Sequence, residues 1–311
     1  MPGKTENPVA VVIPTRDDEP DMLRRSIDSV LGQTYPAVEL IVVDDGSQIP
    51  FAGIEKEYRG RRIRWIASPV NRGAAASRNL GAGEAASGLL AFLDCGDSWR
   101  SAKLERQVAL WKKHAGQRLI YSGAGYFKKG RVRHARPRVK GSLYPAILAR
   151  NLITGSASSV LMDREKFAQV GGFDTSRELP EDHDLWIRLS RRWAWDFVDD
   201  CDVNVFVTPG SRSTAVERKK TSYLAIIGKY QQELTEHSLT DKALANYFER
   251  IAELYKRQGD HASHARWSLL ELTIAPGARN LLRAAVALFE VLSRSNINDF
   301  LSFREPPGDS S

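Results

Sequence analysis

The N-terminal third of the chain alternates between short apolar runs and amphipathic segments, and this alternation constrains the fold more than any other feature. The runs are Val9–Thr15, Glu39–Ser47, Arg62–Ser68 and Leu89–Asp94. Segments with apolar residues at helical spacing separate them. Strands without polar alternation, interleaved with helices, are typical of a mostly parallel sheet covered on both faces. We therefore expect a Rossmann-like α/β domain flanked by helices.

The C-terminal part has a different, helical texture. The segment Lys242–Pro276 carries small and aromatic residues at helical spacing around a Gly-Asp turn. This pattern predicts a helical hairpin, either a single repeat of the tetratricopeptide type or a plain helical tail. We expect an α/β domain over residues 1–220 and an all-helical C-terminal extension over residues 221–311.

Composition excludes several classes of protein. The 311 residues are 42% hydrophobic and 27% charged, which excludes disordered and collagen-like chains. No apolar run reaches about 18 residues, the length that a membrane-spanning helix needs. Two cysteines cannot form a disulfide framework or a cysteine-based zinc site. We expect a cytoplasmic protein.

Positive charge is concentrated in one segment. The net charge is +7, and the run Lys128–Lys140 contains lysines and arginines but no acidic residue. Such a run is typical of a solvated loop, and it also suits an anionic substrate or a membrane surface. Without interleaved aromatic residues or a known DNA-binding pattern, we expect no nucleic-acid partner.

Polar residues stand at the carboxyl ends of three of the four apolar runs. They are Thr15-Arg16-Asp17, Asp44-Asp45-Gly46-Ser47 and Asp94-Cys95-Gly96-Asp97. In open parallel sheets these ends share one edge, where ligands bind. The alternative is that the aspartates cap the helices that follow. The first strand is not followed by G-x-G-x-x-G, which argues against a dinucleotide oxidoreductase.

Five segments, in this order and spacing, resemble one family. They read VVIPTRD, SVLGQTYPAVELIVVDDGS, NRGAAASRNLGAGEAASGLLAFLDCGDSW, VGGFDTS and EDHDLWIRLS. Together they resemble the family 2 glycosyltransferases of the GT-A fold, over residues 9–192. The resemblance implies transfer of a sugar, with inversion at the anomeric carbon, from a nucleotide-activated donor to an acceptor hydroxyl.

The resemblance also implies which residues hold the donor. Asp45 would accept hydrogen bonds from the base, Arg72 would contact base or phosphate, and Arg78 would contact phosphate or form a buried ion pair with an aspartate. The full donor-binding set is Pro14, Thr15, Asp17, Asp44, Asp45, Arg72, Arg78 and Asp94.

A divalent cation is implied as well, with one departure from the family. Members carry D-x-D-D after the fourth strand, and the middle acid binds Mg²⁺ or Mn²⁺ between the two phosphates. Here Gly96 stands at that position. Asp94 and Asp97 could still hold the ion together with the phosphates. The alternative is that a basic side chain stabilises the departing diphosphate in its place.

The catalytic base is implied by the second acidic cluster. An inverting transfer needs a carboxylate that takes the acceptor's proton. The resemblance assigns this role to Asp182, with Glu181 holding position or contacting the acceptor. The alternative is a negatively charged helix N-terminus favoured by the helix dipole. We expect His183 and His134 to face solvent and assign them no role.

Two functions follow from these residues. The first is an inverting glycosyltransferase in polysaccharide, lipopolysaccharide or glycolipid synthesis, with a saccharide or lipid-linked acceptor of anionic character. The basic run Lys128–Lys140 also suits peripheral association with the inner face of a membrane. The second is a weakened protein of the same fold that binds nucleotide sugars or acts as a scaffold.

Overall fold

The computed structural model describes residues 7–128, 130–176, 179–207 and 216–276, together with Asn280 and Ala284. Contacts divide the chain into two compact units. One comprises residues 1–147 and 151–209, and the other comprises residues 148–150 and 210–311. The domain boundary expected at residue 220 falls inside helix α7 (Val216–Lys229).

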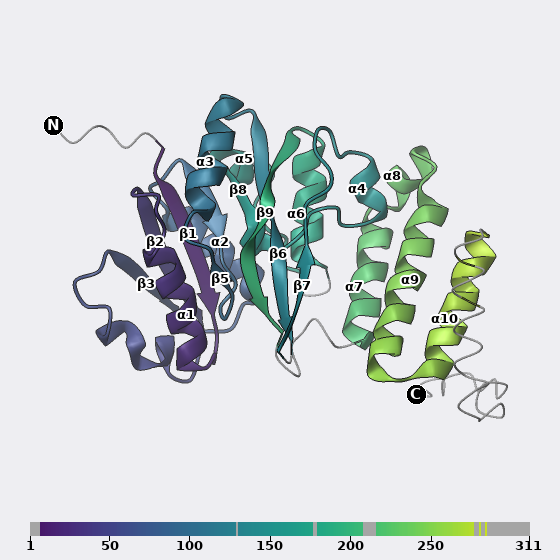
Figure 1. Cartoon of the computed structure of the whole chain (residues 1–311), viewed down its shortest axis with the longest axis horizontal. Coiled ribbons are helices and arrows are strands. Elements are labelled where there is room, and N and C mark those ends of the chain that lie inside the picture. The colour runs from purple at the N-terminus through teal and green to yellow at the C-terminus, as the bar shows by residue number, and fades with distance from the viewer. Residues whose placement is uncertain are drawn as a thin grey trace. The chain divides into compact units, whose positions relative to one another are not determined.

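In the described part of the first unit, nine strands form one sheet, in the order β3-β2-β1-β4-β8-β6-β9-β5, with β7 paired to β6 (Figure 1). The strands are β1 (Val9–Thr15), β2 (Val38–Asp45), β3 (Ile63–Ser68), β4 (Leu89–Phe92), β5 (Ser98–Trp99), β6 (Arg118–Lys128), β7 (Arg131–Ala135), β8 (Val160–Asp163) and β9 (Ala194–Phe206). Strands β1 to β4 are parallel, and β8 runs antiparallel to both β4 and β6. The sheet is therefore parallel in its N-terminal half and mixed beyond β4.

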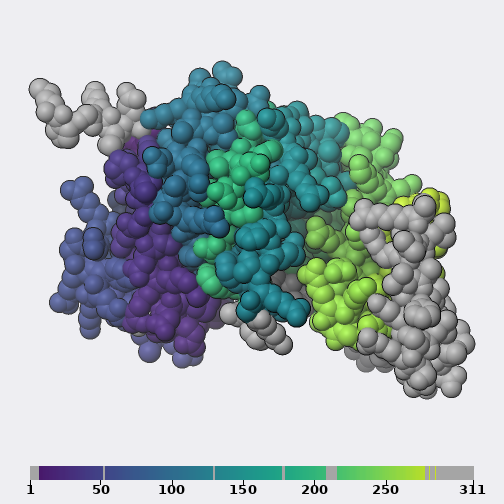
Figure 2. Space-filling view, viewed as in Figure 1, coloured from purple at the N-terminus to yellow at the C-terminus, as the bar shows by residue number. Residues whose placement is uncertain are grey.

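The register of the parallel strands aligns their carboxyl ends. Thr15 of β1 lies opposite Asp44 of β2, and Val12 lies opposite Phe92 of β4. The polar segments after these strands consequently emerge at the same edge of the sheet. At one side of the sheet, β3 is the edge strand, and it forms the blue margin of Figure 2 together with the 3-10 segment η1 (Pro50–Lys56).

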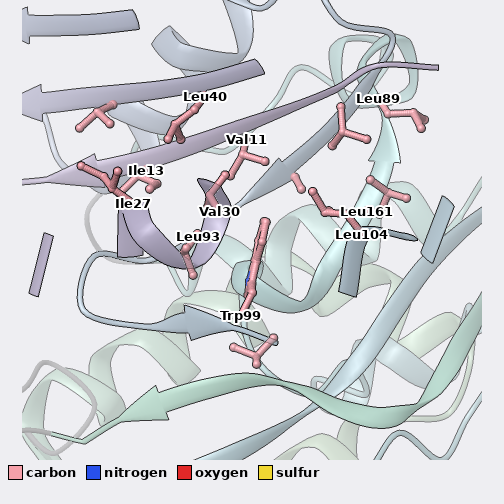
Figure 3. Close-up of a cluster of buried hydrophobic side chains, with 14 of the residues drawn as sticks. Val11, Ile13, Ile27, Val30, Leu40, Leu89, Leu93, Trp99, Leu104 and Leu161 are labelled. Carbon is pink, nitrogen blue, oxygen red and sulfur yellow. The ribbon is translucent and has the colours of Figure 1, made fainter. Parts of the chain in front are cut away.

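Helices cover both faces of the parallel strands. Helices α1 (Pro20–Leu31) and α3 (Lys103–Lys113) pack on one face, where Val11, Ile13, Ile27 and Leu104 share a buried cluster (Figure 3). Helix α2 (Ala74–Glu84) packs on the opposite face. A Cβ added at Gly81 would collide with Val12 and Val43, so glycine allows this close approach.

Further α-helices lie between β7 and β9 in the chain. They are α4 (Ala146–Ala149), α5 (Arg164–Gln169) and α6 (Glu181–Ser190). Phe92 of β4 contacts both Phe167 and Phe173, with ring centroids 5.5 and 5.0 Å apart. The strand expected at residues 156–163 is shorter in the structure. Its first half is the 3-10 turn η2 (Ala157–Ser159), because the Ser156 side chain accepts a hydrogen bond from the backbone of Ser158.

The second unit is helical in its described residues. Its elements include α7, α8 (Gln231–Glu236), α9 (Thr240–Gln258) and α10 (His261–Ile274). The expected hairpin is present. Gly259, whose φ is 81°, is the C-cap of α9, and Asp260 is the N-cap of α10, where its side chain accepts a hydrogen bond from the Ser263 N–H. Tyr247 and Trp267 pack the pair, with ring centroids 5.7 Å apart. None of the described helices combines the length and apolar character needed to cross a bilayer.

His183 is buried, which differs from the solvent exposure expected from sequence. Helix α6 turns its ring inward, and Nε2 lies 2.7 Å from the Ile147 carbonyl oxygen. Burial lowers the pKa of this imidazole to about 4. The ring is therefore neutral at physiological pH, whereas His134 is exposed on β7.

The buried His183 predicts a loss of stability in acid. Between pH 6.5 and 4 the unfolded chain binds a proton at this residue that the folded chain does not, so the free energy of unfolding should fall by about 2 kcal/mol from pH 7 to pH 5. Urea unfolding at both pH values measures the change. His183→Gln should lose this part of the pH dependence of stability, while His134→Gln should keep it. An equal pH dependence in the wild-type chain and His183→Gln would contradict the assignment.

Candidate active site

A polar pocket lies where β1 and β2 end. The Asp17 N–H donates to Ser47 Oγ at 2.9 Å, and the Gln48 N–H donates back to Asp17 Oδ1 at 2.9 Å. These bonds join the two loops around a pocket of about 320 Å³, lined by Thr15, Asp17, Asp18, Glu19, Pro20, Ser47, Gln48 and Ile49. Two of the predicted donor-binding residues, Thr15 and Asp17, therefore line the pocket.

The next two predicted residues, Asp44 and Asp45, are buried and bound to backbone N–H groups. Asp44 accepts from Ser47 at 2.9 Å and from Phe51 at 3.3 Å. Asp45 accepts from Arg72 and Gly73, at 2.8 Å each, where α2 begins. These bonds hold both carboxylates against loop backbone, but neither aspartate is the N-cap residue of η1 or α2. Contact with a nucleotide stays a prediction for both carboxylates. Pro14, also predicted, is buried in β1 opposite Val43.

The two predicted arginines have different environments. The side chain of Arg72 is exposed beside the start of α2. The guanidinium of Arg78, one turn further along α2, is only 6% exposed. It donates to Asp94 Oδ1 at 2.5 Å and to Glu181 Oε1 at 3.2 Å. The structure therefore has the buried ion pair that the sequence left as one alternative for Arg78.

The charges around Arg78 favour its protonated form. Burial of the guanidinium lowers its pKa, but the carboxylates of Asp94 and Glu181 outweigh that effect and raise the pKa above its ordinary value. Arg78 therefore holds together two acids that lie 16 and 103 residues away in the chain. One of them ends a strand of the parallel sheet, and the other begins α6.

Two serines brace the loop after β4, and sequence reasoning did not single them out. Ser156 Oγ donates to Asp94 Oδ2 at 3.2 Å. Ser158 Oγ accepts the Asp94 N–H at 3.1 Å and donates to Asp97 Oδ2 at 3.2 Å. The Ser158 carbonyl oxygen accepts the indole N–H of Trp99 at 2.8 Å. The run of small polar residues Ser156–Ser159 was the only signal that could have indicated this brace.

The predicted metal ligands do not fit a divalent cation as they are arranged here. Both oxygens of Asp94 are taken, by Arg78 and Ser156. Asp97 is buried, and burial followed by the nearby Asp94 charge raises the pKa of its carboxyl well above the ordinary value, which disfavours the charged form that a hard cation binds. Across the described residues, no group of three histidine, cysteine or acidic side chains is placed to hold a metal ion.

The predicted base, Asp182, follows Glu181 in the first turn of α6. Its Oδ1 accepts from the His183 N–H at 2.7 Å, and its Oδ2 lies 3.5 Å from the Asn151 amide. Its neighbour Glu181 is held by Arg78. The structure thus links Asp94, Arg78 and Glu181 directly and places Asp182 beside them. Asn151 is a further residue that the sequence gave no reason to select.

Removing the Arg78 cation should destabilise the fold. Arg78→Ala leaves Asp94 and Glu181 without their shared partner, and breaking a fully buried pair costs about 3–5 kcal/mol. Because these carboxylates are about one third exposed, we expect a smaller loss of about 2–3 kcal/mol in the free energy of unfolding. Urea denaturation measures it. Arg72→Ala, with an exposed side chain, is the matched control and should change stability by less than about 0.5 kcal/mol; equal losses would refute the bridge.

The chain is similar to several known proteins. The family model for glycosyl transferase family 2 matches residues 10–171. An uncharacterized glycosyltransferase of Rickettsia typhi is 26% identical over 272 residues, which are 83% of this chain and 83% of that protein. The Escherichia coli protein WfgD, a UDP-Glc:alpha-D-GlcNAc-diphosphoundecaprenol beta-1,3-glucosyltransferase, is 35% identical over 106 residues. That match covers 34% of this chain and 42% of WfgD.

A solved structure shares the fold. The crystal structure of S. aureus TarS residues 1–349 in complex with UDP-GlcNAc matches with a TM-score of 0.59 at 15% identity. The match covers 86% of this chain and 91% of that one. The expected fold class, a GT-A-type sheet flanked by helices with a helical C-terminal region, is confirmed. With more than half of its residues matched by the family model, the chain belongs to glycosyl transferase family 2.

Proposed function

We propose that this glycosyltransferase moves a sugar from a nucleoside-diphosphate sugar to an acceptor hydroxyl, with inversion at the anomeric carbon, in the synthesis of a polysaccharide, lipopolysaccharide or glycolipid. The observation that carries the proposal is the chain of contacts Asp94–Arg78–Glu181, which sets the predicted base next to the end of the parallel sheet. The relatives support it. WfgD is named for a UDP-Glc donor, and TarS was crystallised with UDP-GlcNAc.

The donor would bind across the carboxyl ends of the parallel strands. The nucleoside would occupy the pocket lined by Thr15 and Asp17, and Asp45 would accept a hydrogen bond from its base. The exposed cation of Arg72 would then meet the base or the phosphates. Polar groups on fixed strand ends suit this task because they need little reorganisation when the ligand arrives.

Transfer needs one proton acceptor on the acceptor side. The Asp182 carboxylate would take the proton of the acceptor hydroxyl as its oxygen bonds to the anomeric carbon. The bond from that carbon to the diphosphate oxygen breaks on the opposite face, and the nucleoside diphosphate leaves with the electron pair. Glu181 would act as a positioning residue, because Arg78 already holds its carboxylate.

The catalytic proposal is tested with the full chain and a panel of nucleotide sugars. A thermal-shift screen of these donors identifies the one that binds, since ligand binding raises apparent stability. With that donor, Asp182→Asn should keep donor affinity within about twofold and lower turnover by about 10²–10⁴-fold. The control is Asp199→Asn, an exposed carboxylate on β9, which should turn over normally.

The outcomes separate the two candidate functions. Near-normal turnover by Asp182→Asn would refute its role as base. Tight nucleotide binding by the wild-type chain without turnover of any donor would instead favour the second candidate, a nucleotide-sugar-binding or scaffolding protein. The observation behind that alternative is Gly96, which stands where the family carries an acid.

The acceptor proposal rests on the hairpin of β6 and β7. Its exposed residues Lys128, Arg131 and Arg133 belong to the basic run of the sequence, and Arg133 lies 4.8 Å from the ring centroid of Tyr126. A row of exposed cations favours an anionic acceptor, such as the lipid-linked diphosphate that the name of WfgD specifies, and would hold the chain at a membrane surface.

Neutralising the cations of this hairpin should weaken binding of the acceptor and leave binding of the donor unchanged. Replacing Lys128, Arg131 and Arg133 by glutamine should lower binding to phosphatidylcholine vesicles carrying a polyisoprenyl diphosphate by at least about tenfold at low salt, at roughly 1 kcal/mol per cation. Vesicle sedimentation measures the binding. Donor affinity should not change, and vesicles without the diphosphate lipid are the control. Unchanged vesicle binding by the triple variant would rule out this surface.

A further inference from the structure

We infer that Arg25 of α1 supplies the positive charge that a divalent cation supplies to the donor diphosphate in other members of the family. The inference rests on the proposed function, since it concerns the donor of that reaction. It is motivated by the loop Asp94–Asp97, which has lost the middle acid of the family pattern and keeps Gly96 at that position.

The backbone conformation and the packing of this loop favour glycine at residue 96. The φ of Gly96 is 92°, in the left-handed region that side-chain-bearing residues rarely adopt. A Cβ placed on Gly96 would lie 2.5 Å from the Cε of Met22. An aspartate could not enter without displacement of this methionine. Two separate features, the backbone angle and the packing of Met22, thus disfavour the acid that would hold the metal.

An arginine occupies the space beside this glycine. Arg25 Nε donates to the Gly96 carbonyl oxygen at 2.9 Å. Its Nη2 would lie 3.8 Å from a Cβ at Gly96. The guanidinium also stacks over Phe206, 4.1 Å from the ring centroid. Arg25 is therefore fixed from two sides, beside the position of the missing side chain.

The charge of Arg25 is not neutralised by a direct partner. Within the described ranges, no carboxylate oxygen lies within 4.0 Å of its guanidinium, and neither Nη group has a hydrogen-bond acceptor there. Its neighbour Arg24 differs, because it pairs with Glu57 at 2.6 Å and with Asp21 at 2.7 Å. Of these two arginines of α1, Arg25 is thus the one that keeps its Nη donors available for an anion.

The loop connects Arg25 to the nucleotide pocket. Cys95, next to Gly96, lies against Thr15 and Asp18, two residues that line the pocket. A nucleoside in that pocket would extend its phosphates along this loop. The planar guanidinium can bind phosphate oxygens through two parallel hydrogen bonds, which a point charge cannot do.

The net charge at the site supports the replacement of an aspartate and its divalent cation by Gly96 and Arg25. An aspartate and a divalent cation together bring one net positive charge to a site. Glycine and Arg25 bring the same net charge without an ion from solution. A carboxylate beside the diphosphate would repel it when no metal is bound, whereas the glycine does not.

Calorimetric titration of the full chain with UDP and UMP, and with GDP and GMP, tests the inference in 1 mM EDTA and in 1 mM Mn²⁺. The dissociation constant of the diphosphate that binds should agree within about twofold between the two buffers. Arg25→Gln should weaken that diphosphate about 10–100-fold in both buffers, as expected for charge-assisted hydrogen bonds, and the monophosphate by less than about threefold. Arg24→Gln is the matched control and should bind normally, while Arg25→Lys should recover part of the affinity.

The contradicting outcomes are distinct. Diphosphate binding that Mn²⁺ tightens more than tenfold, with the same gain in Arg25→Gln, would overturn the inference and leave the proposed function standing. Equal loss of monophosphate and diphosphate affinity in a folded Arg25→Gln would also overturn it. Failure of every nucleotide to bind the wild-type chain, in EDTA and in Mn²⁺ alike, would overturn the proposed function and this inference with it.

Discussion

The candidate site depends on one buried cation. Arg78 contacts Asp94 and Glu181, which come from separate segments of the chain, and without it these two carboxylates would lose the cation that they share. Taking a guanidinium out of water is costly, and only well-placed partners offset that cost. The two ion pairs of Arg78 therefore matter more for the positions of Asp94 and Glu181 than for the net stability of the fold. The two contacts connect the start of α6 to the loop after β4.

The loop after β4 shows a second constraint of the same kind. Its acids are fixed by neutral groups as well as by charge: Ser158 binds Asp94 through the backbone and Asp97 through the carboxyl, and Trp99 anchors Ser158 in turn. A loop that contains a glycine in the left-handed region would otherwise sample many conformations. Hydrogen bonds from a neighbouring 3-10 turn thus supply the rigidity that a bound ion supplies in many metalloenzymes.

The sequence predicted the local elements well because their signals are local. The apolar runs and helical spacings gave the parallel strands, the helices α1, α2 and α3, and the hairpin of α9 and α10. The convergence of strand ends followed from sheet geometry alone. What the sequence could not supply was the long-range partner of each polar group. His183 was expected outside and lies inside, since its contact with Ile147 joins residues 36 apart. The half-strand at Ser156–Ser159 became a turn because a serine side chain competes for the backbone.

Arg25 illustrates why a departure from a family pattern must be interpreted in three dimensions. In sequence, Gly96 is a missing ligand, and Arg25 is an unremarkable residue of an amphipathic helix 71 positions away. In space the two are one feature, because the carbonyl of the glycine fixes the arginine and Met22 fills the volume that an acid would need. An aspartate restored at residue 96 would meet both the strained backbone angle and the methionine, and it would also neutralise the arginine. The helix and the loop must therefore be considered as a single unit, because an acid at residue 96 would displace the side chain of Met22 on α1.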